Sequence, residues 1–146
     1  MRTVALAISK TLLPGIDSSA VGTMLKDLFK QSKNTVFVTD LAHASLRAMV
    51  EKYAMGGKLV PMVVSITKFK KKRDAYVARA LAVAGMASEC YSFHDMNDWT
   101  ASAVLIASVF RREHPDYTLA TYLVAEDQVV EMTLDDLIRT SGFKEA

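Results

Sequence analysis

Apolar residues recur along this chain in two alternating patterns, short runs with strand-like spacing and longer runs with helical spacing. Residues 3–9 alternate large and small apolar side chains, which is typical of a strand buried on both faces. Residues 21–28 place apolar side chains at positions i, i+3, i+4 and i+7, and Ser18 can cap the N-terminus of the helix that this spacing predicts. The first part of the sequence therefore predicts a strand followed by a helix.

The same order occurs twice more downstream. Residues 34–39 predict a second strand, and Asp40 is placed to cap a second helix over residues 46–53. Residues 59–66 are nearly all apolar and rich in β-branched side chains, which predicts a third strand. Because Pro61 cannot donate a ladder hydrogen bond, it belongs near the start of that strand or on an edge strand.

A third helix and a fourth strand follow. Residues 77–84 predict a helix that ends before Gly85, and residues 90–93 predict a short strand. Successive strand and helix units form right-handed crossovers, so the pattern predicts a mainly parallel sheet that helices cover on both faces.

One later segment permits two interpretations. Residues 99–110 are apolar on every side, which fits either a buried helix or a long strand. Asp98 as an N-cap and the polar residues 111–115 favour the helix.

The last part of the sequence predicts a β-hairpin and a short helix. Residues 118–124 and 128–132 have strand-like spacing and are joined by a turn at residues 126–127. Thr133 can cap a final helix over residues 134–140, whose first turn carries acidic residues that the helix dipole favours.

Together these elements predict an α/β protein: a single three-layer domain over residues 1–146, with a mainly parallel sheet flanked by helices, a C-terminal β-hairpin and a short helix. The 146 residues, 51% of them apolar, suffice for one domain and are too few for two. No apolar run approaches the about 20 residues that cross a bilayer, so we expect a cytoplasmic protein with no membrane partner. Cys90 is the single cysteine, which excludes an intramolecular disulfide, and we expect it to be buried.

Charge is concentrated in one short run. The chain has 18 Lys and Arg against 16 Asp and Glu, and five of these cations fall within residues 68–73. Such a cluster predicts binding to nucleic acid or to an acidic protein. Residues 113–146 carry two cations and eight acids, so the run can instead pair with this acidic end, within the chain or between copies of a homo-oligomer. The run consists of Lys68, Lys70, Lys71, Lys72 and Arg73.

A second candidate site follows from the predicted sheet. In an open parallel sheet, ligands bind outside the carboxyl ends of the strands, where helix N-termini converge. Lysines there would meet phosphate groups, a carboxylate would hold a ribose hydroxyl, and the first helix would offer N–H groups, so we expect a phosphorylated or nucleotide-like ligand. Plain helix capping is the alternative role for the serines and for Asp40. The ligand-binding candidates are Lys10, Ser18, Ser19, Asp40 and Lys68.

Catalytic and metal-binding signals are weaker. His94 beside Asp95 forms a candidate general base, and Asp40 is a further candidate, whereas a His in a loop is more often a solvated surface residue. The three histidines have no metal-ligand spacing, so no metal site is predicted. Neither the glycine-rich dinucleotide fingerprint nor the GKS/T phosphate loop is present. The sequence identifies no cofactor and does not decide whether the protein is an enzyme.

Part of the chain resembles the small phage enzymes that cleave S-adenosylmethionine. The resemblance lies in residues 77–79, 90–101 and 104–105, with an echo in residues 39–41. It implies an oligomer with sites between subunits and an antiparallel hairpin over residues 90–109. His43, Ser45 and Arg47 stand where that family has Gly, Tyr and Glu, and Gly57 and Lys58 replace an expected acid, so no catalytic residue is carried over.

The sequence thus predicts a compact oligomeric α/β domain of prokaryotic or phage type that binds a phosphorylated or nucleotide-like ligand. A non-enzymatic module that docks through its basic run is the alternative, and a relative of the S-adenosylmethionine-cleaving enzymes without their catalytic residues is another.

Overall fold

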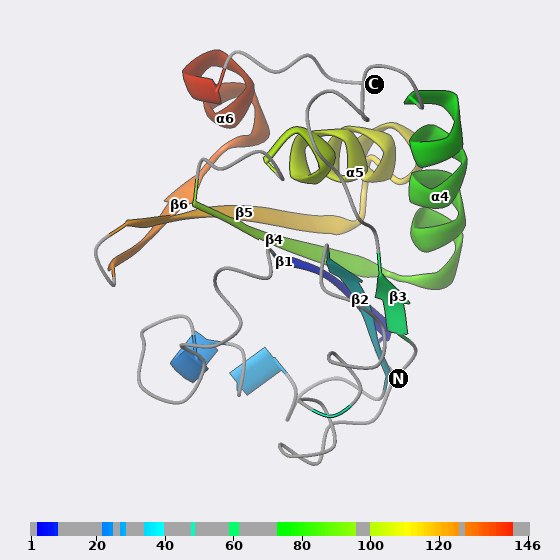
Figure 1. Ribbon diagram of the computed structural model, residues 1–146, viewed down its shortest axis with the longest axis horizontal. Helices are drawn as coiled ribbons and strands as arrows, with labels where there is room; N and C mark the ends of the chain where they lie inside the picture. The colour runs from blue at the N-terminus through cyan, green and yellow to red at the C-terminus, as the bar shows by residue number, and fades with distance from the viewer. Residues whose placement is uncertain are drawn as a thin grey trace.

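Nine helices and strands are defined by the computed structural model of the chain, which describes residues 3–8, 22–24, 27–28, 34–39, 48, 59–61, 73–95, 100–125 and 128–141 (Figure 1). In chain order they are β1 Thr3–Ile8, β2 Asn34–Thr39, β3 Leu59–Pro61, α4 Arg73–Met86, β4 Glu89–His94, α5 Thr100–Glu113, β5 Thr118–Ala125, β6 Gln128–Met132 and α6 Leu134–Ser141.

The strands form one six-stranded sheet in the order β3-β2-β1-β4-β5-β6. The first five strands run parallel and β6 runs antiparallel to β5, so the prediction of a mainly parallel sheet is confirmed. β1 is the third of the six strands, and its residues Val4 to Ile8 are all buried, as expected for a strand covered on both faces. Pro61 is on an edge strand, as predicted.

The C-terminal strands pair as predicted, but they are not a separate unit. Thr121 pairs with Met132 and Ala125 with Gln128 in antiparallel register. β5 also pairs in parallel with β4, with Ser92 opposite Thr121, so the main sheet continues through β5 into β6.

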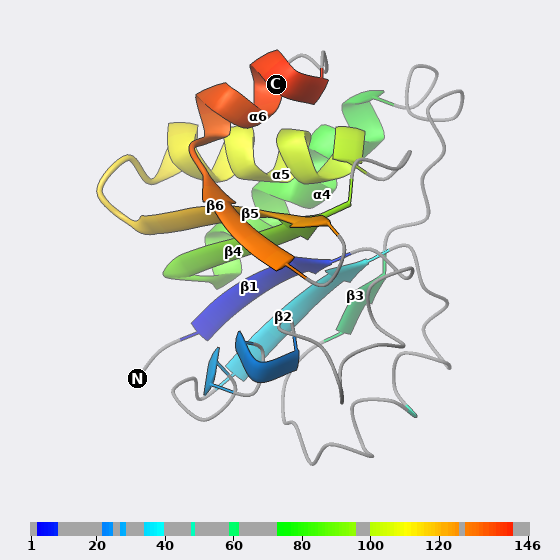
Figure 2. The ribbon, with the colours of Figure 1, turned by 90° about the vertical axis from the view of Figure 1, so that its left-hand side faces the viewer.

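Helices α4, α5 and α6 all lie on the same face of the sheet (Figures 1 and 2). The helical residues 22–24 and 27–28 lie on the opposite face. This arrangement agrees with right-handed crossovers, because the order β1-β2-β3 runs one way from β1 and β4-β5 runs the other way. Among the described residues, one face of the sheet is covered by the three helices α4, α5 and α6, whereas the other face has the short helical stretches at residues 22–24 and 27–28.

The core between α4, α5 and the sheet combines large apolar side chains with many alanines. Ala80 and Ala84 of α4 and Ala103 of α5 belong to the same buried cluster as Ala5 and Ala7 of β1. Such residues let two helices and a sheet approach closely without leaving voids. Cys90 lies in this cluster and is fully buried, which confirms the prediction for it.

Helix α5 explains the ambiguous apolar segment. All residues from Ala103 to Phe110 are buried, because α5 is enclosed by the sheet, α4 and α6. The predicted helix is confirmed, and it continues through Arg111 to Glu113. The hairpin over residues 90–109 that the family resemblance implied is absent, since β4 ends at His94 and α5 begins at Thr100.

Of two predicted helix ends, the structure contradicts one and confirms the other. The predicted end of the third helix before Gly85 is wrong, because α4 continues to Met86; Gly85 is exposed and has open space around it. Thr133 caps α6 as predicted, since its Oγ1 accepts the Asp136 N–H at 3.1 Å.

Several other predictions fall elsewhere in the chain. The helix predicted over residues 46–53, apart from Ala48, and the part of the third strand after Pro61 lie outside the described residues. Within the described part, no helix is long and apolar enough to span a membrane.

Candidate functional site

The carboxyl ends of β1 to β5 share one edge of the sheet, because these strands are all parallel. Ile8 ends β1 and pairs with Phe93, and His94 ends β4 one residue further along. Thr39 ends β2 and pairs with Pro61. The prediction that the strand ends meet at a common edge is therefore confirmed for these residues.

The strand order reverses at this edge between β1 and β4. From β1 the chain proceeds to β2 on one side, whereas β4 lies on the other side of β1 and leads into α5 (Figure 2). In open α/β sheets, the connections diverge at such a reversal, and ligands bind outside the strand ends there. The geometry thus singles out the ends of β1 and β4 from the other strand ends.

The side chain at this reversal is His94, and it is fully buried. Neither its Nδ1 nor its Nε2 has a hydrogen-bond partner in the part of the chain that the structure describes. Side chains alternate along a strand, so His94 shares the α4–α5 face with Cys90, which packs in the core cluster on that side. A buried polar group without a partner costs about 1–3 kcal/mol, so an unpartnered His94 imidazole lowers the stability of the fold instead of raising it.

Burial also determines the charge of His94. Loss of solvation lowers the pKa of the imidazole from 6.5 to about 4, although the nearby charge of Asp95 acts in the opposite direction. The ring is therefore neutral at neutral pH and presents one hydrogen-bond donor and one acceptor. It carries no positive charge with which to attract a phosphate group.

One of the two sequence-based interpretations of His94 needs correction. The solvated-loop interpretation is wrong, because His94 is the last residue of β4 and is buried. A general base oriented by Asp95 requires a hydrogen bond between them, and the described residues supply none to the imidazole. Asp95 itself is half-buried, just beyond the strand.

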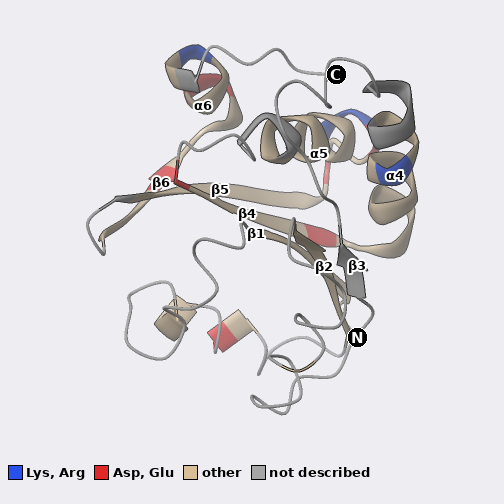
Figure 3. Cartoon of the chain, viewed as in Figure 1, with Lys and Arg blue, Asp and Glu red and all other residues tan. Residues whose placement is uncertain are grey.

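The remaining predicted site residues lie outside the described part of the chain, except that the backbone of Arg73 is described. Of the basic run, Arg73 is the first residue of α4, and its side chain is not described. Figure 3 shows the described charges elsewhere, with acidic residues on β6 and α6 and basic residues on α4, α5 and α6. The predicted site residues outside the described part are Lys10, Ser18, Ser19, Asp40, Lys68, Lys70, Lys71 and Lys72.

Sequence reasoning missed Ser92, which lies two residues before His94 on the same face of β4. Its Oγ is buried and also lacks a hydrogen-bond partner among the described residues. The available signal was the alternation Cys90, Ser92, His94, which places two polar side chains on the side of the sheet that α4 and α5 cover.

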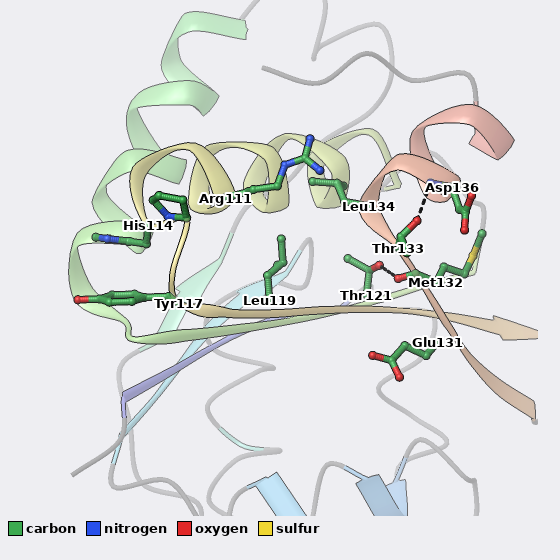
Figure 4. A pocket seen from close by; sticks show the side chains of 11 residues that line it. Arg111, His114, Tyr117, Leu119, Thr121, Glu131, Met132, Thr133, Leu134 and Asp136 are labelled. Carbon is green, nitrogen blue, oxygen red and sulfur yellow. Dashed lines mark hydrogen bonds between the residues drawn. The ribbon is translucent and has the colours of Figure 1, made fainter.

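A pocket of about 560 Å³ lies on the same face of the sheet, between the end of α5, the strands β5 and β6 and the start of α6 (Figure 4). Leu119 and Thr121 lie on its β5 side, and Arg111 and Leu134 lie across from them. The side chain of Glu131 points to the other side of the strands. The lining residues are Arg111, His114, Pro115, Tyr117, Leu119, Thr121, Glu131, Met132, Thr133, Leu134 and Asp136.

Several polar groups of this pocket already have partners within the chain. Arg111 pairs with Asp135 at 3.1 Å, and the His114 Nε2 lies 2.7 Å from the Ala84 carbonyl oxygen. The Thr121 hydroxyl donates to the Met132 carbonyl oxygen. Ligand sites need polar groups that are free to turn toward a ligand, so the end of β4 is the stronger candidate.

The order of the five parallel strands, β3-β2-β1-β4-β5, reverses at β1 as in doubly wound α/β sheets, and the antiparallel β6 is added at the edge. In comparisons with known proteins, no protein-family model matches the chain, and no curated protein is significantly similar to it. The chain is therefore classified by its fold alone.

Proposed function

We propose that this chain binds a nucleotide-like ligand at the carboxyl edge of its sheet, where the strand order reverses between β1 and β4. The observation that carries the proposal is His94, a fully buried imidazole without a described hydrogen-bond partner at the end of β4. Natural proteins satisfy most buried polar groups, so each exception calls for an explanation, and a bound ligand group is one.

The chemistry of His94 fits the uncharged part of such a ligand. A neutral imidazole can donate to a carbonyl or ring nitrogen and accept from an amine or hydroxyl, which are the groups of a base or a ribose. Ser92, one donor and two acceptor lone pairs on the same face, adds to this capacity.

In this proposal, the residues that follow the other strands in sequence bind the charged part of the ligand. Lys10 comes two residues after β1 and Asp40 directly after β2. In this proposal Lys10 and Lys68 meet phosphate oxygens, Asp40 holds a ribose hydroxyl, and Ser18 and Ser19 open a helix whose N–H groups face the anion.

Thermal unfolding with a ligand panel tests the proposal. A ligand at about 100 times its Kd stabilises a protein by about 2.7 kcal/mol, which raises Tm by about 5–10 °C for a chain of this size. The panel compares a nucleoside triphosphate, its nucleoside, S-adenosylmethionine and inorganic pyrophosphate. The proposal is refuted if none of the nucleotides or nucleosides shifts Tm at millimolar concentration.

A pair of variants ties any shift to the site. His94→Leu removes both polar atoms with little change in volume, and we expect the ligand-dependent shift to disappear while the apo protein stays folded. His114→Leu is the matched control, because His114 lies at the far end of α5 from this edge. Equal loss in both variants would place the ligand elsewhere.

A second candidate function is docking through the basic run at residues 68–73 on nucleic acid or an acidic protein. Its support is the charge balance, because without these five cations the acids would outnumber the cations by 16 to 13. Replacing Lys70, Lys71 and Lys72 with Gln should weaken polyanion binding and flatten its salt dependence. Unchanged binding to DNA and RNA at two salt concentrations would refute this candidate.

A further inference from the structure

The two edges of the sheet differ in how they resist pairing with another strand. An exposed edge strand presents unpaired N–H and C=O groups, and natural proteins protect it by shortness, proline, lysine or bulges. The β3 edge has one of these protections in its described part, because Leu59–Pro61 contains a proline. β6 has five residues, a continuous register with β5, no proline and no lysine.

The β6 edge also carries the most exposed large apolar side chain in the described part of the chain. Val130 is 53% exposed, although it lies in the middle of a strand. No described strand pairs with the outer side of β6, which is the edge of the sheet that faces the viewer in Figure 2. Within the described part of the chain, this five-residue strand with an exposed central valine therefore has an unpaired outer side.

The direction of each backbone group on β6 follows from its pairing with β5. The Met132 carbonyl oxygen accepts the Thr121 hydroxyl, so Met132 turns its backbone groups toward β5. Backbone groups of successive strand residues point to opposite sides, so Val130 also faces β5, whereas Val129 and Glu131 direct their N–H and C=O groups outward.

We propose that β6 pairs with β6 of a second copy of this chain, antiparallel and centred on Val130, so that the two sheets become one. In this register Val129 of each copy exchanges backbone hydrogen bonds with Glu131 of the other. Val130 then lies opposite Val130 of the second copy, in the position where cross-strand side chains are closest. The pairing follows two-fold symmetry, as an isologous contact requires.

The charges on β6 select this register over its neighbours. A shift that centres the pairing on Glu131 sets the two Glu131 carboxylates directly opposite, and a shift toward Val129 sets Val130 opposite Gln128 instead of Val130 of the second copy. Like charges directly opposite each other destabilise a sheet. The register centred on Val130 avoids this repulsion and packs the two exposed valines against each other. This inference does not depend on the ligand proposal.

Sedimentation velocity of the full chain across a wide concentration range tests the contact. We expect a reversible monomer–dimer equilibrium that Val130→Lys weakens at least about tenfold, because two ammonium groups would meet at the centre. Val129→Lys should tighten it about fivefold, since each new lysine lies opposite Glu131 of the other copy. Leu81→Lys is the matched control, because Leu81 is 40% exposed on α4, and it should change nothing.

Cysteine cross-linking tests the register directly and does not depend on how the charge variants behave. Residues in a non-hydrogen-bonded antiparallel pair have Cα atoms about 4.5 Å apart, within the disulfide range of about 4.4–6.8 Å. Val130→Cys should therefore give a disulfide-linked dimer on oxidation, whereas Glu131→Cys, diagonal to its own copy by about 7–8 Å, should not. Native Cys90 is buried and stays out of the reaction.

Two results would overturn the proposed β6 contact. A monomer at every concentration overturns the proposal, whether or not β6 accepts a strand from some other protein. A dimer that survives Val130→Lys, or that Leu81→Lys weakens equally, places the contact on another surface and also overturns it.

Discussion

Acidification should destabilise this protein through His94. The imidazole has a pKa of 6.5 when exposed and of about 4 in the native state, because burial removes the water that would solvate its charge. Below pH 6.5 the unfolded chain therefore binds a proton that the native chain does not. The free energy of unfolding is unaffected by His94 above pH 6.5, falls as the pH drops from 6.5 to 4, and levels off below 4.

The magnitude follows from the two pKa values. Each pKa unit of difference corresponds to about 1.4 kcal/mol, so the His94 contribution is about 2 kcal/mol of lost stability at pH 5 and about 3 kcal/mol at pH 4. That is a large share of the about 5–15 kcal/mol by which a domain is usually stable.

Urea unfolding from pH 8 to pH 4, for the wild type and for His94→Leu, isolates this contribution. Other titrating groups affect both proteins alike, so the difference between the two stability curves belongs to His94. We expect His94→Leu to be at least as stable as the wild type at pH 7.5, because an unpartnered polar group is removed, and its advantage should grow by about 2 kcal/mol at pH 5. His94→Gln cannot titrate but stays polar, so it should share the flat pH dependence at lower overall stability.

Two results would refute the reasoning. Stability curves of wild type and His94→Leu that stay parallel from pH 8 to pH 4 would mean that the imidazole is solvated or hydrogen-bonded. A titration of the His94 ring near pH 6.5 in the native state, followed by NMR, would lead to the same conclusion.

Three further predictions concern the core and one helix cap. Burial raises the pKa of the Cys90 thiol to about 12, so a thiol reagent should leave native protein unmodified at pH 8 and react only on unfolding; rapid stoichiometric labelling would contradict the burial. Thr133→Ala should cost about 1 kcal/mol in urea unfolding by removing the cap on the Asp136 N–H, and Thr133→Ser should restore it. Phe110→Ala should cost about 3–5 kcal/mol because that ring is buried, against less than about 1 kcal/mol for exposed Leu81→Ala; similar losses would argue against the packing of α5.

The elements that the sequence predicted well are those whose pattern is set locally. β2 occupies residues 34–39 and β6 occupies residues 128–132, the predicted ranges, because polar residues bound each run at the point where pairing stops. Thr133 caps α6 because the capping interaction joins residues three apart in the sequence. Such features need no knowledge of distant parts of the chain.

The features that the sequence did not reveal depend on distant contacts. Strand order was one, since no local pattern states that β5 joins the sheet beside β4. His94 was another, because a histidine at a strand end has the same neighbours in sequence whether a helix covers it or water does. Its burial depends on what packs against the end of β4 in space. The open edge of β6 likewise follows from what lies beside it in space.

The antiparallel direction of β6 determines where the two ligand sites of the proposed dimer lie and whether binding at one affects the other. Two sheets joined through antiparallel β6 strands are related by a two-fold axis perpendicular to the sheet, so β1 to β5 of one copy run opposite to those of the other. Their carboxyl edges then open toward opposite borders of the joined sheet, with the entire dimer contact between them. Each copy would hold its own ligand from residues of its own chain, and titration of the dimer should follow a simple hyperbola, with occupancy of one edge leaving the affinity of the other unchanged.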